Sequence, residues 1–208
     1  MSKPTLIILT GRKQTGKDTL GDYLRENHFY TQYAFGDRLK EITANFVNFL
    51  IDNGTGTEHI KPLDFNSNDF KTAKVSTPIL LDDNILMDTL DNRDLLIAMG
   101  AGGGIMEKLN PLYFVDYVIS HLKRFHFSNA IITDARLLPE IERTKEKLKN
   151  IYNIVVVKLE SVDEDTKDKA ITESLDYDKA DYYIMNDKTL GKSHFYQQIE
   201  NLLLTISR

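Results

Sequence analysis

The sequence predicts an α/β fold in which a central parallel sheet carries helices on both faces. Three apolar runs, 5–10, 130–133 and 151–159, have the length and composition of buried strands. Between these runs lie segments whose apolar residues recur every three or four positions, as they do on one face of a helix. Strands that alternate with helices form parallel sheets, and such sheets bind ligands at the carboxyl ends of their strands.

The expected elements follow one another in a regular order. The expected strands are 5–10, 29–35, 130–133, 151–159 and 181–185. The expected helices are 18–25, 37–50, 93–99, 111–125, 138–148 and 195–206. Leu39, Ile42 and Phe46 show the helical spacing of the second helix, and Pro111 suits the first turn of the fourth. With 208 residues the chain can bury one large core, and we expect a single domain over 1–208.

Three segments break this order. Residues 52–92 contain scattered Gly, Pro, Asn and Asp with few apolar residues. A connection of this length is unusual in a compact domain, so we expect an insertion or lid over a site. Residues 161–180 are polar and charged. The glycine cluster 100–104 follows a helix and not a strand, which predicts a helix stop with a flexible approach to a ligand and argues against a dinucleotide-binding fingerprint.

The composition excludes several classes of protein. The lack of cysteine excludes disulfides, thiolate metal sites and cysteine nucleophiles. The net charge is −5 and no stripe of Lys and Arg is present, so we do not expect a nucleic-acid partner. The sequence shows neither a signal-type run nor an apolar stretch long enough to span a bilayer, so we expect a soluble cytoplasmic protein without a membrane partner.

The most informative stretch is Gly11-Arg-Lys-Gln-Thr-Gly-Lys-Asp-Thr19, between the first strand and the first helix. A phosphate-binding P-loop has the pattern G-x-x-x-x-G-K-[ST], which Gly11, Gly16 and Lys17 satisfy, although the hydroxyl comes one residue late as Thr19. Glycines let the backbone close around an anion, the N–H groups at the helix start face the phosphates, and the lysine adds a mobile positive charge. The alternative is an ordinary strand-to-helix turn, but strand, spacing and helix together favour a nucleoside triphosphate site.

A second candidate site segment is Asp134-Ala-Arg136, which directly follows a buried strand. An acidic residue at the end of a strand can hold Mg²⁺ or its waters beside a triphosphate. The guanidinium of Arg136 can bind a phosphate with paired donors. The alternative is a loop with a surface salt bridge, and the nearby P-loop pattern favours the functional interpretation.

Cations also occur at the start of two expected helices. Arg93 begins the apolar helix 93–99, where a positive charge is unfavourable against the helix dipole and so suggests an anion to meet it. Asp37, Arg38 and Lys40 begin the helix 37–50. For these residues a capping aspartate with exposed basic neighbours explains the pattern as well as a binding role does.

Several segments together resemble the phage deoxynucleoside monophosphate kinases, a family of P-loop nucleotide kinases. These segments are Gly11–Thr19, Phe35-Gly-Asp-Arg-Leu-Lys40, Arg93-Asp-Leu-Leu-Ile-Ala-Met-Gly100, Ile132-Thr-Asp-Ala-Arg136 with Pro139-Glu-Ile141, and Thr172-Glu-Ser-Leu-Asp176 with Asp181-Tyr-Tyr-Ile-Met-Asn186. No single motif is decisive, but their order is specific and they span most of the chain. The resemblance implies a three-layer α/β/α P-loop kinase fold with a central parallel sheet, an acceptor-binding insertion at 52–92 and a lid at 161–180.

The resemblance also implies an activity, the transfer of the γ-phosphoryl group of ATP to a deoxynucleoside 5′-monophosphate with Mg²⁺ as cofactor. The residues implied to bind ATP are Gly11, Arg12, Lys13, Gln14, Thr15, Gly16, Lys17, Asp18, Thr19 and Asn186. Those implied to bind the acceptor are Asp37, Lys40, Arg93 and Arg136. The catalytic residues would be Lys17, Arg93, Asp134 and Arg136, and the metal residues Asp18 and Asp134. No general base is needed, because a phosphate monoester is already an anionic nucleophile.

Two features depart from the family's pattern. After Gly100, relatives carry polar and basic residues where this chain has Ala-Gly-Gly-Gly-Ile. The expected lid lacks the arginine that helps to stabilise the transferring phosphoryl group, so either Lys167 or Lys169 substitutes, or Arg12 and Arg136 suffice. These departures bear on efficiency and substrate choice more than on reaction class.

The sequence leaves two other functions open. One is a P-loop kinase of another small phosphorylated acceptor, since phosphomevalonate kinase shares a G-K-D loop and an Asp-x-Arg segment. The other is a nucleotide-binding regulatory protein without transferase activity. The accepted base, the preference for deoxyribose or ribose and the oligomeric state also stay open, although the resemblance favours a homodimer and, for a phage-encoded protein, the host cytoplasm.

Overall fold

The computed structural model describes residues 3–52, 59–73, 80–81, 84–85, 91–100, 104–162 and 179–207. The chain divides into two compact units, one comprising Met1–Phe35 with Val115–Arg208 and the other Gly36–Phe114. The second unit contains the expected insertion 52–92. Most of the expected lid 161–180, including Lys167 and Lys169, lies outside the described residues.

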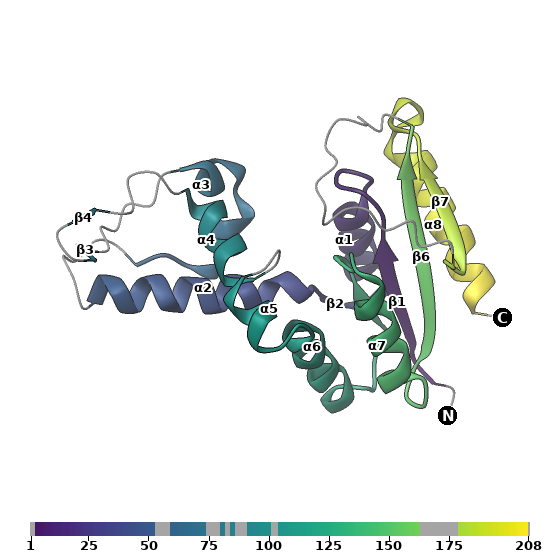
Figure 1. Cartoon of the computed structure of the whole chain (residues 1–208). Coiled ribbons are helices and arrows are strands. Elements are labelled where there is room, and N and C mark those ends of the chain that lie inside the picture. The colour runs from purple at the N-terminus through teal and green to yellow at the C-terminus, as the bar shows by residue number, and fades with distance from the viewer. Residues whose placement is uncertain are drawn as a thin grey trace. The chain divides into compact units, whose positions relative to one another are not determined.

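The first unit is built on a parallel sheet (Figure 1). Its strands are β1 (Thr5–Thr10), β2 (Thr31–Tyr33), β5 (Ala130–Ile132), β6 (Asn153–Ser161) and β7 (Tyr182–Asn186). The five strands lie in the order β2-β5-β1-β6-β7, and every neighbouring pair is parallel. The predicted α/β class with a central parallel sheet is therefore confirmed, and the first strand occupies the centre.

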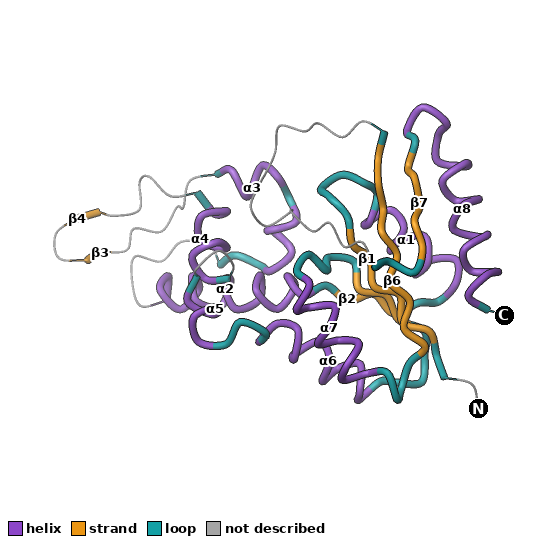
Figure 2. The backbone as a smooth tube through the Cα atoms, turned by 45° about the vertical axis from the view of Figure 1, so that its right-hand side comes forward, coloured by secondary structure: helices purple, strands orange, loops and turns teal. Residues whose placement is uncertain are grey.

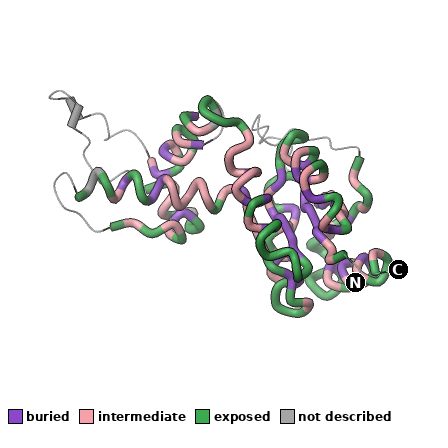
Figure 3. Tube along the Cα trace, turned by 90° about the horizontal axis from the view of Figure 1, so that it is seen from below, coloured by how far each residue is buried: buried purple, intermediate pink, exposed green. Residues whose placement is uncertain are grey.

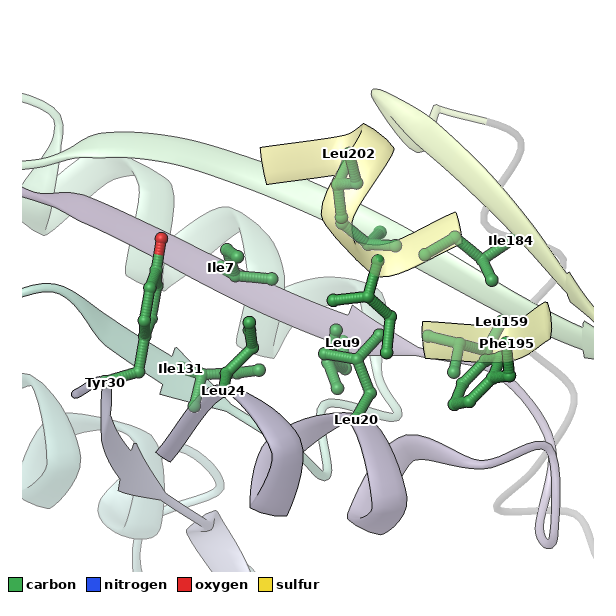
Figure 4. Close-up of a cluster of buried hydrophobic side chains, with 12 residues drawn as sticks. Ile7, Leu9, Leu20, Leu24, Tyr30, Ile131, Leu159, Ile184, Phe195 and Leu202 are labelled. Carbon is green, nitrogen blue, oxygen red and sulfur yellow. The ribbon is translucent and has the colours of Figure 1, made fainter. Parts of the chain in front are cut away.

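Helices α1 (Lys17–His28) and α8 (Gly191–Ile206) cover one face of this sheet. Ile7 and Leu9 of β1 belong to a buried cluster with Leu20 of α1 and with Phe195 and Leu202 of α8 (Figure 4). Because side chains alternate between the faces of a strand, these two β1 residues point to the same side. A single apolar layer therefore holds both helices against the strand that leads into the glycine loop.

The opposite face of β1 is equally apolar. Leu6 and Ile8 alternate with the cluster residues and are fully buried. Helices α6 (Tyr113–Arg124) and α7 (Leu138–Leu148) lie on this side of the sheet (Figure 2) and bring in buried residues such as Leu122 and Ile141. The central strands β1 and β5 are buried along almost their whole length, as a sheet covered on both faces requires, whereas the edge strands β2 and β7 are mostly intermediate or exposed (Figure 3).

The expected strand 29–35 is wrong at both ends. Phe29 follows the last turn of α1 in a left-handed conformation with φ of 56°, its N–H bonds to the carbonyl of Leu24, and its side chain is exposed. Phe35 already belongs to the next helix, α2 (Phe35–Asp52). Only Thr31–Tyr33 pairs with β5. The aromatic residues at both ends of the segment made the predicted strand longer than the observed one.

The second unit consists mainly of short elements. After Gly36 in α2 these are η1 (Pro62–Asn66), α3 (Asn68–Thr72), β3 (Leu80–Leu81), β4 (Asn84–Ile85), α4 (Asn92–Met99) and α5 (Ile105–Leu109). Phe65 is fully buried and meets Phe70 edge-to-face, with 5.2 Å between ring centroids. The amide of Asn48 exchanges two hydrogen bonds with the backbone of Ile60, each of 2.9 Å. These contacts hold a segment, 59–73, that has no repeating apolar pattern of its own.

Among the described residues, the structure contains no helix with the length and apolarity that a bilayer crossing requires. A short 3-10 turn, η3 (Lys188–Leu190), connects β7 to α8 and starts with an Asp187 cap, whose Oδ1 accepts from the N–H of Thr189 at 2.9 Å.

The core of the first unit predicts unequal effects for two leucines on one helix. Leu202 of α8 is 5% exposed and Leu204 is 64% exposed. We expect Leu202→Ala to lower the free energy of unfolding by about 2–5 kcal/mol, because it leaves a cavity in the cluster. Leu204→Ala makes the same change in helix propensity and should cost under about 0.5 kcal/mol. Urea unfolding followed by circular dichroism measures both, and equal effects would contradict the assigned face of α8.

Candidate active site

The glycine loop connects β1 directly to α1. Gly11, Gln14 and Gly16 have positive φ values of 134°, 65° and 103°. Gly16 is the N-cap of α1 and offers no side-chain oxygen to the first N–H groups of the helix. These donors and the positive end of the helix dipole therefore remain directed at the loop, which is the arrangement that binds phosphates.

Lys17 places a positive charge on the loop itself. Its Nζ donates to the carbonyl of Gly11 at 2.7 Å and also to the carbonyl of Arg12. The ammonium group thus folds back from the first residue of α1 to the beginning of the loop. A bound anion in the loop would lie beside this charge.

The loop approaches β6 closely at its first residue. A Cβ atom on Gly11 would lie 2.2 Å from the carbonyl oxygen of Leu159, far inside van der Waals contact. At the other end of the loop, the side chain of Thr15 is buried and its hydroxyl donates to the carbonyl of Arg12 at 2.9 Å. The amide of Asn186, the last residue of β7, donates to the carbonyl of Thr15 at 3.1 Å. The loop therefore crosses the carboxyl edge of the sheet from β1 over β6 to β7.

The side chains of the other predicted ATP-binding residues are exposed or half-buried. Arg12, Lys13, Gln14 and Asp18 are exposed, and Thr19 is half-buried on α1. Their side chains are therefore accessible to a ligand, whereas Thr15 and Asn186 act on the loop from within the fold.

Asp134 lies at the same edge of the sheet. Ile8 of β1 pairs with Ile132 of β5, so Thr10 and Asp134 each follow two residues later on neighbouring strands. Oδ1 of Asp134 accepts a hydrogen bond of 2.7 Å from the N–H of Phe35, at the start of α2. The predicted metal residue therefore also caps a helix, a role that the sequence did not indicate.

Arg136 is exposed, and its side chain forms no hydrogen bond or ion pair with any other described residue. Its backbone is held firmly, because Oε2 of Glu140 accepts from the N–H groups of Arg136 and Leu137 at 2.6 and 2.8 Å. Burial raises the pKa of Glu140 above its usual value, although these backbone hydrogen bonds act in the opposite direction. Sequence reasoning missed Glu140 as a site residue, and the signal was an acidic residue in the first turn of the helix that follows Arg136.

The carboxylates of the described residues are compatible with Mg²⁺ bound as nucleotide enzymes bind it. No group of three or more His, Asp or Glu side chains forms a metal cage in this part of the chain. Mg²⁺ usually binds one or two carboxylates and completes its shell with water and phosphate oxygens, so a cage is not required. The hydroxyl of Thr10, next to the loop, is buried and has no hydrogen-bond partner among the described residues. An unpaired buried hydroxyl is costly, and a bound water or phosphate oxygen that reached it would satisfy it.

Arg93 lies in the second unit, at the start of α4. Asp91 and Asp94 form a capping box there, with hydrogen bonds of 2.8 and 3.0 Å between their side chains and each other's N–H groups. The neighbouring Asn92 is buried, and its amide donates to the carbonyl of Phe70 at 2.8 Å. Arg93 is exposed and its side chain bonds to no other described residue. A rigid helix start therefore presents this guanidinium to solvent.

Asp37 and Lys40 bond to each other within the second unit. Lys40 Nζ lies 2.9 Å from Oδ1 of Asp37 and 2.9 Å from Oδ1 of Asn66. Arg38 pairs with Glu41 at 2.6 Å, and its hydrogen bonds to Glu41 and Tyr113 raise its pKa further. Both predicted acceptor residues thus have structural partners, and Asn66 joins them as a polar neighbour that the sequence did not single out.

The structure brings together one half of the predicted site. The glycine loop, Asn186, Asp134 and Arg136 all belong to the first unit, at the carboxyl ends of its strands. Asp37, Lys40 and Arg93 belong to the second unit. The roles assigned to these residues stay predictions.

Comparison with known structures supports the fold. The chain is similar to the APS kinase of Mycobacterium tuberculosis, with a TM-score of 0.50 and 7% identity over 100% of both chains. A provisionally assigned kinase of Chloroflexus aurantiacus matches with a TM-score of 0.46 and 13% identity, over 99% of this chain and 98% of that one. A gluconokinase of Sinorhizobium meliloti matches 76% of this chain and 58% of its own, with a TM-score of 0.33 and 11% identity.

At these identities the likeness concerns the fold alone. The chain has an α/β fold whose parallel five-stranded sheet, in the order 2-3-1-4-5 when its strands are numbered along the chain, matches that of P-loop kinases. No protein-family model matches the sequence, and no curated protein matches it.

The close approach at Gly11 predicts a contrast between two glycines with positive φ. Gly191 has φ of 77°, and a Cβ atom there would meet nothing within 4 Å. Its ψ of 172° places it in a region that is essentially open to glycine alone, so we expect Gly191→Ala to cost about 1–3 kcal/mol of unfolding free energy through backbone strain alone. Gly11→Ala adds a clash with Leu159, so it should cost more and also weaken ATP binding. Urea unfolding and calorimetric ATP titration test this, and equal stability of the two variants would contradict the loop geometry.

Proposed function

We propose that this protein is an ATP-dependent phosphotransferase of the P-loop kinase type whose acceptor is a deoxynucleoside 5′-monophosphate. The observation that carries the proposal is the geometry of the loop Gly11–Gly16. The ammonium group of Lys17 bonds to the first residue of this loop, and at its last residue α1 begins without a side-chain cap. Its position at the end of the central strand of a kinase-type sheet supports the same conclusion.

The donor side follows from this geometry. The N–H groups at the start of α1 and the ammonium group of Lys17 bind the β- and γ-phosphates of ATP. Lys17 exchanges its bonds to loop carbonyls for bonds to phosphate oxygens, so its ammonium group keeps hydrogen-bond partners when the nucleotide binds. Asp18 and Asp134 would hold Mg²⁺, directly or through its waters. Mg²⁺ held there would supply positive charge that offsets the negative charge of the transferring phosphoryl group.

The transfer requires positioning more than acid–base chemistry. A phosphate oxygen of the acceptor forms a bond to the γ-phosphorus, and the bond from that phosphorus to the β–γ bridging oxygen breaks, giving ADP and the nucleoside diphosphate. Arg93 and Arg136 would bind the acceptor phosphate and offset the repulsion between the two anionic substrates. Both guanidinium groups are exposed, each carried by a backbone that side chains hold in place.

The choice of acceptor rests on the resemblance of segments spread along the chain to deoxynucleoside monophosphate kinases. The similar structure from Mycobacterium tuberculosis is an APS kinase, so APS belongs among the acceptors to be tested. A phosphomevalonate-type acceptor is the other candidate, because the G-K-D loop and the Asp-x-Arg segment are shared features.

A panel of acceptors tests the proposal directly. With ATP and Mg²⁺, we expect ADP release to depend on a deoxynucleoside monophosphate and to stop when the metal is chelated. The same assay with ribonucleoside monophosphates, phosphomevalonate, dephospho-coenzyme A and APS measures selectivity. Turnover with one of these and with no deoxynucleoside monophosphate would assign another acceptor. ATP binding without turnover on any acceptor would indicate a regulatory protein.

Variants of the two arginines distinguish transfer from binding. We expect Arg93→Ala and Arg136→Ala each to lower kcat/KM about a hundredfold or more, because a charge that stabilises the transition state is lost. Arg136→Ala leaves the Glu140 cap intact, since Glu140 bonds to the backbone of residue 136. Arg25→Ala, which removes an exposed arginine from α1, is the control and should leave kcat/KM within a factor of about two. Full activity of the Arg136 variant would exclude it from the transfer site.

A further inference from the structure

We propose that Asn186 is a positioning residue for the phosphate loop, which orients the Gly16 N–H toward the bound nucleotide without contacting the nucleotide itself. The inference rests on the proposed function only in that a nucleotide occupies the loop. It assigns to the last residue of β7 a task that differs from direct ligand binding.

The contact that carries the inference is a single hydrogen bond. Nδ2 of Asn186 donates to the carbonyl oxygen of Thr15 at 3.1 Å, across 171 residues of sequence. Asn186 is fixed in turn by its strand, since its register partner on β6 is Ser161. The donor therefore belongs to the sheet, and the acceptor belongs to the loop.

The planarity of the peptide bond transmits this contact to Gly16. In a trans peptide the carbonyl and the following N–H point in opposite directions. Asn186 holds the Thr15 carbonyl toward β7, so we expect the N–H of Gly16 to point away from β7, toward a nucleotide bound in the loop. Gly16 is the N-cap of α1, and its own carbonyl already accepts from the N–H of Leu20 at 2.9 Å. The peptide groups on both sides of Gly16 are thus held by hydrogen bonds of their carbonyls, which leaves the N–H of Gly16 available to a ligand.

The packing around Gly16 leaves no room for a side chain at this position. A Cβ atom on Gly16 would lie 2.6 Å from Nδ2 of Asn186 and 3.2 Å from Cζ of Phe195. Phe195 is buried and belongs to the cluster that holds α8 on the sheet. The amide of Asn186 and the ring of Phe195 therefore pack directly against the loop at position 16.

An asparagine suits this position better than its close relatives. An aspartate of the same shape would turn acceptor oxygens toward the Thr15 carbonyl and add a negative charge close to the phosphates. A leucine keeps the size but offers no donor. These two substitutions therefore separate the hydrogen bond from the volume of the side chain.

The experiment is a calorimetric titration of the full chain with ADP and Mg²⁺, without an acceptor. We expect Asn186→Leu to raise the Kd about tenfold, the factor that matches one ordinary hydrogen bond, and Asn186→Asp to raise it further. Asn27→Leu is the matched control. Its side chain amide also donates to a backbone carbonyl, that of Tyr23 at 3.0 Å, but in the last turn of α1, so its Kd should equal that of the wild type.

A local readout separates positioning from general stability. In ¹H–¹⁵N spectra, ADP should shift the Gly16 amide strongly in the wild type and in Asn27→Leu, and much less in Asn186→Leu. Unfolding midpoints of the variants show whether any of them is simply less folded, and Asn186→Asp keeps the test open if Asn186→Leu does not fold. An unchanged Kd in both Asn186 variants, or a Kd that rises only with the loss of folded protein, would overturn the inference.

Failure of the proposed function gives a different result. A wild-type protein that binds neither ADP nor ATP overturns both proposals. Normal binding that weakens in the Asn186 variants, with no turnover on any acceptor, supports the positioning role and rejects the kinase.

Discussion

The path of the glycine loop over the carboxyl edge of the sheet is the constraint on which the rest of the first unit depends. The loop leaves β1, passes the carbonyl of Leu159 on β6 and reaches Asn186 on β7. A side chain at position 11 or 16 would clash with these groups, so both positions require glycine. The path also determines where α1 begins, on the face of the sheet that α8 shares. An edge strand and the C-terminal helix therefore help to shape a loop near the N-terminus.

The sequence was most informative where the determinants are local. The strand, the loop and the start of α1 are contiguous, and the spacing of Gly11, Gly16 and Lys17 describes a backbone shape that is set within a few residues. The boundary between β2 and α2 was not predictable in this way. The first turn of α2 includes Phe35, whose N–H is satisfied by Asp134, 99 residues further along the chain. A helix start that is capped by a residue so distant in sequence carries no signal in the residues around it.

The second unit shows a further limit of pattern reasoning. Its short elements are held by individual polar contacts, such as Asn48 with Ile60 and Lys40 with Asn66. A single asparagine amide produces no periodic pattern in the sequence, so the segment looked irregular.

The positive charge of Arg93 was evident from the sequence, and the structure shows which neighbouring residues stabilise it. The acidic residues Asp91 and Asp94 flank it and offset the unfavourable helix dipole. The cation therefore does not by itself require an anionic ligand.

The double role of Asp134 affects how its variants should be interpreted. Asp134 follows β5, the strand next to β1, at the edge of the sheet where a nucleotide enzyme needs an acidic residue, and its carboxylate also caps α2 through Phe35. Phe35 is the last residue of the first unit before the chain enters the second. An alanine at position 134 would thus remove a metal candidate and free the start of the connecting helix at the same time. Asn keeps an acceptor for the Phe35 N–H while it removes the charge, so a comparison of Asp134→Asn with Asp134→Ala separates the two roles. A loss of activity common to both variants belongs to the charge, and a loss confined to Asp134→Ala belongs to the cap.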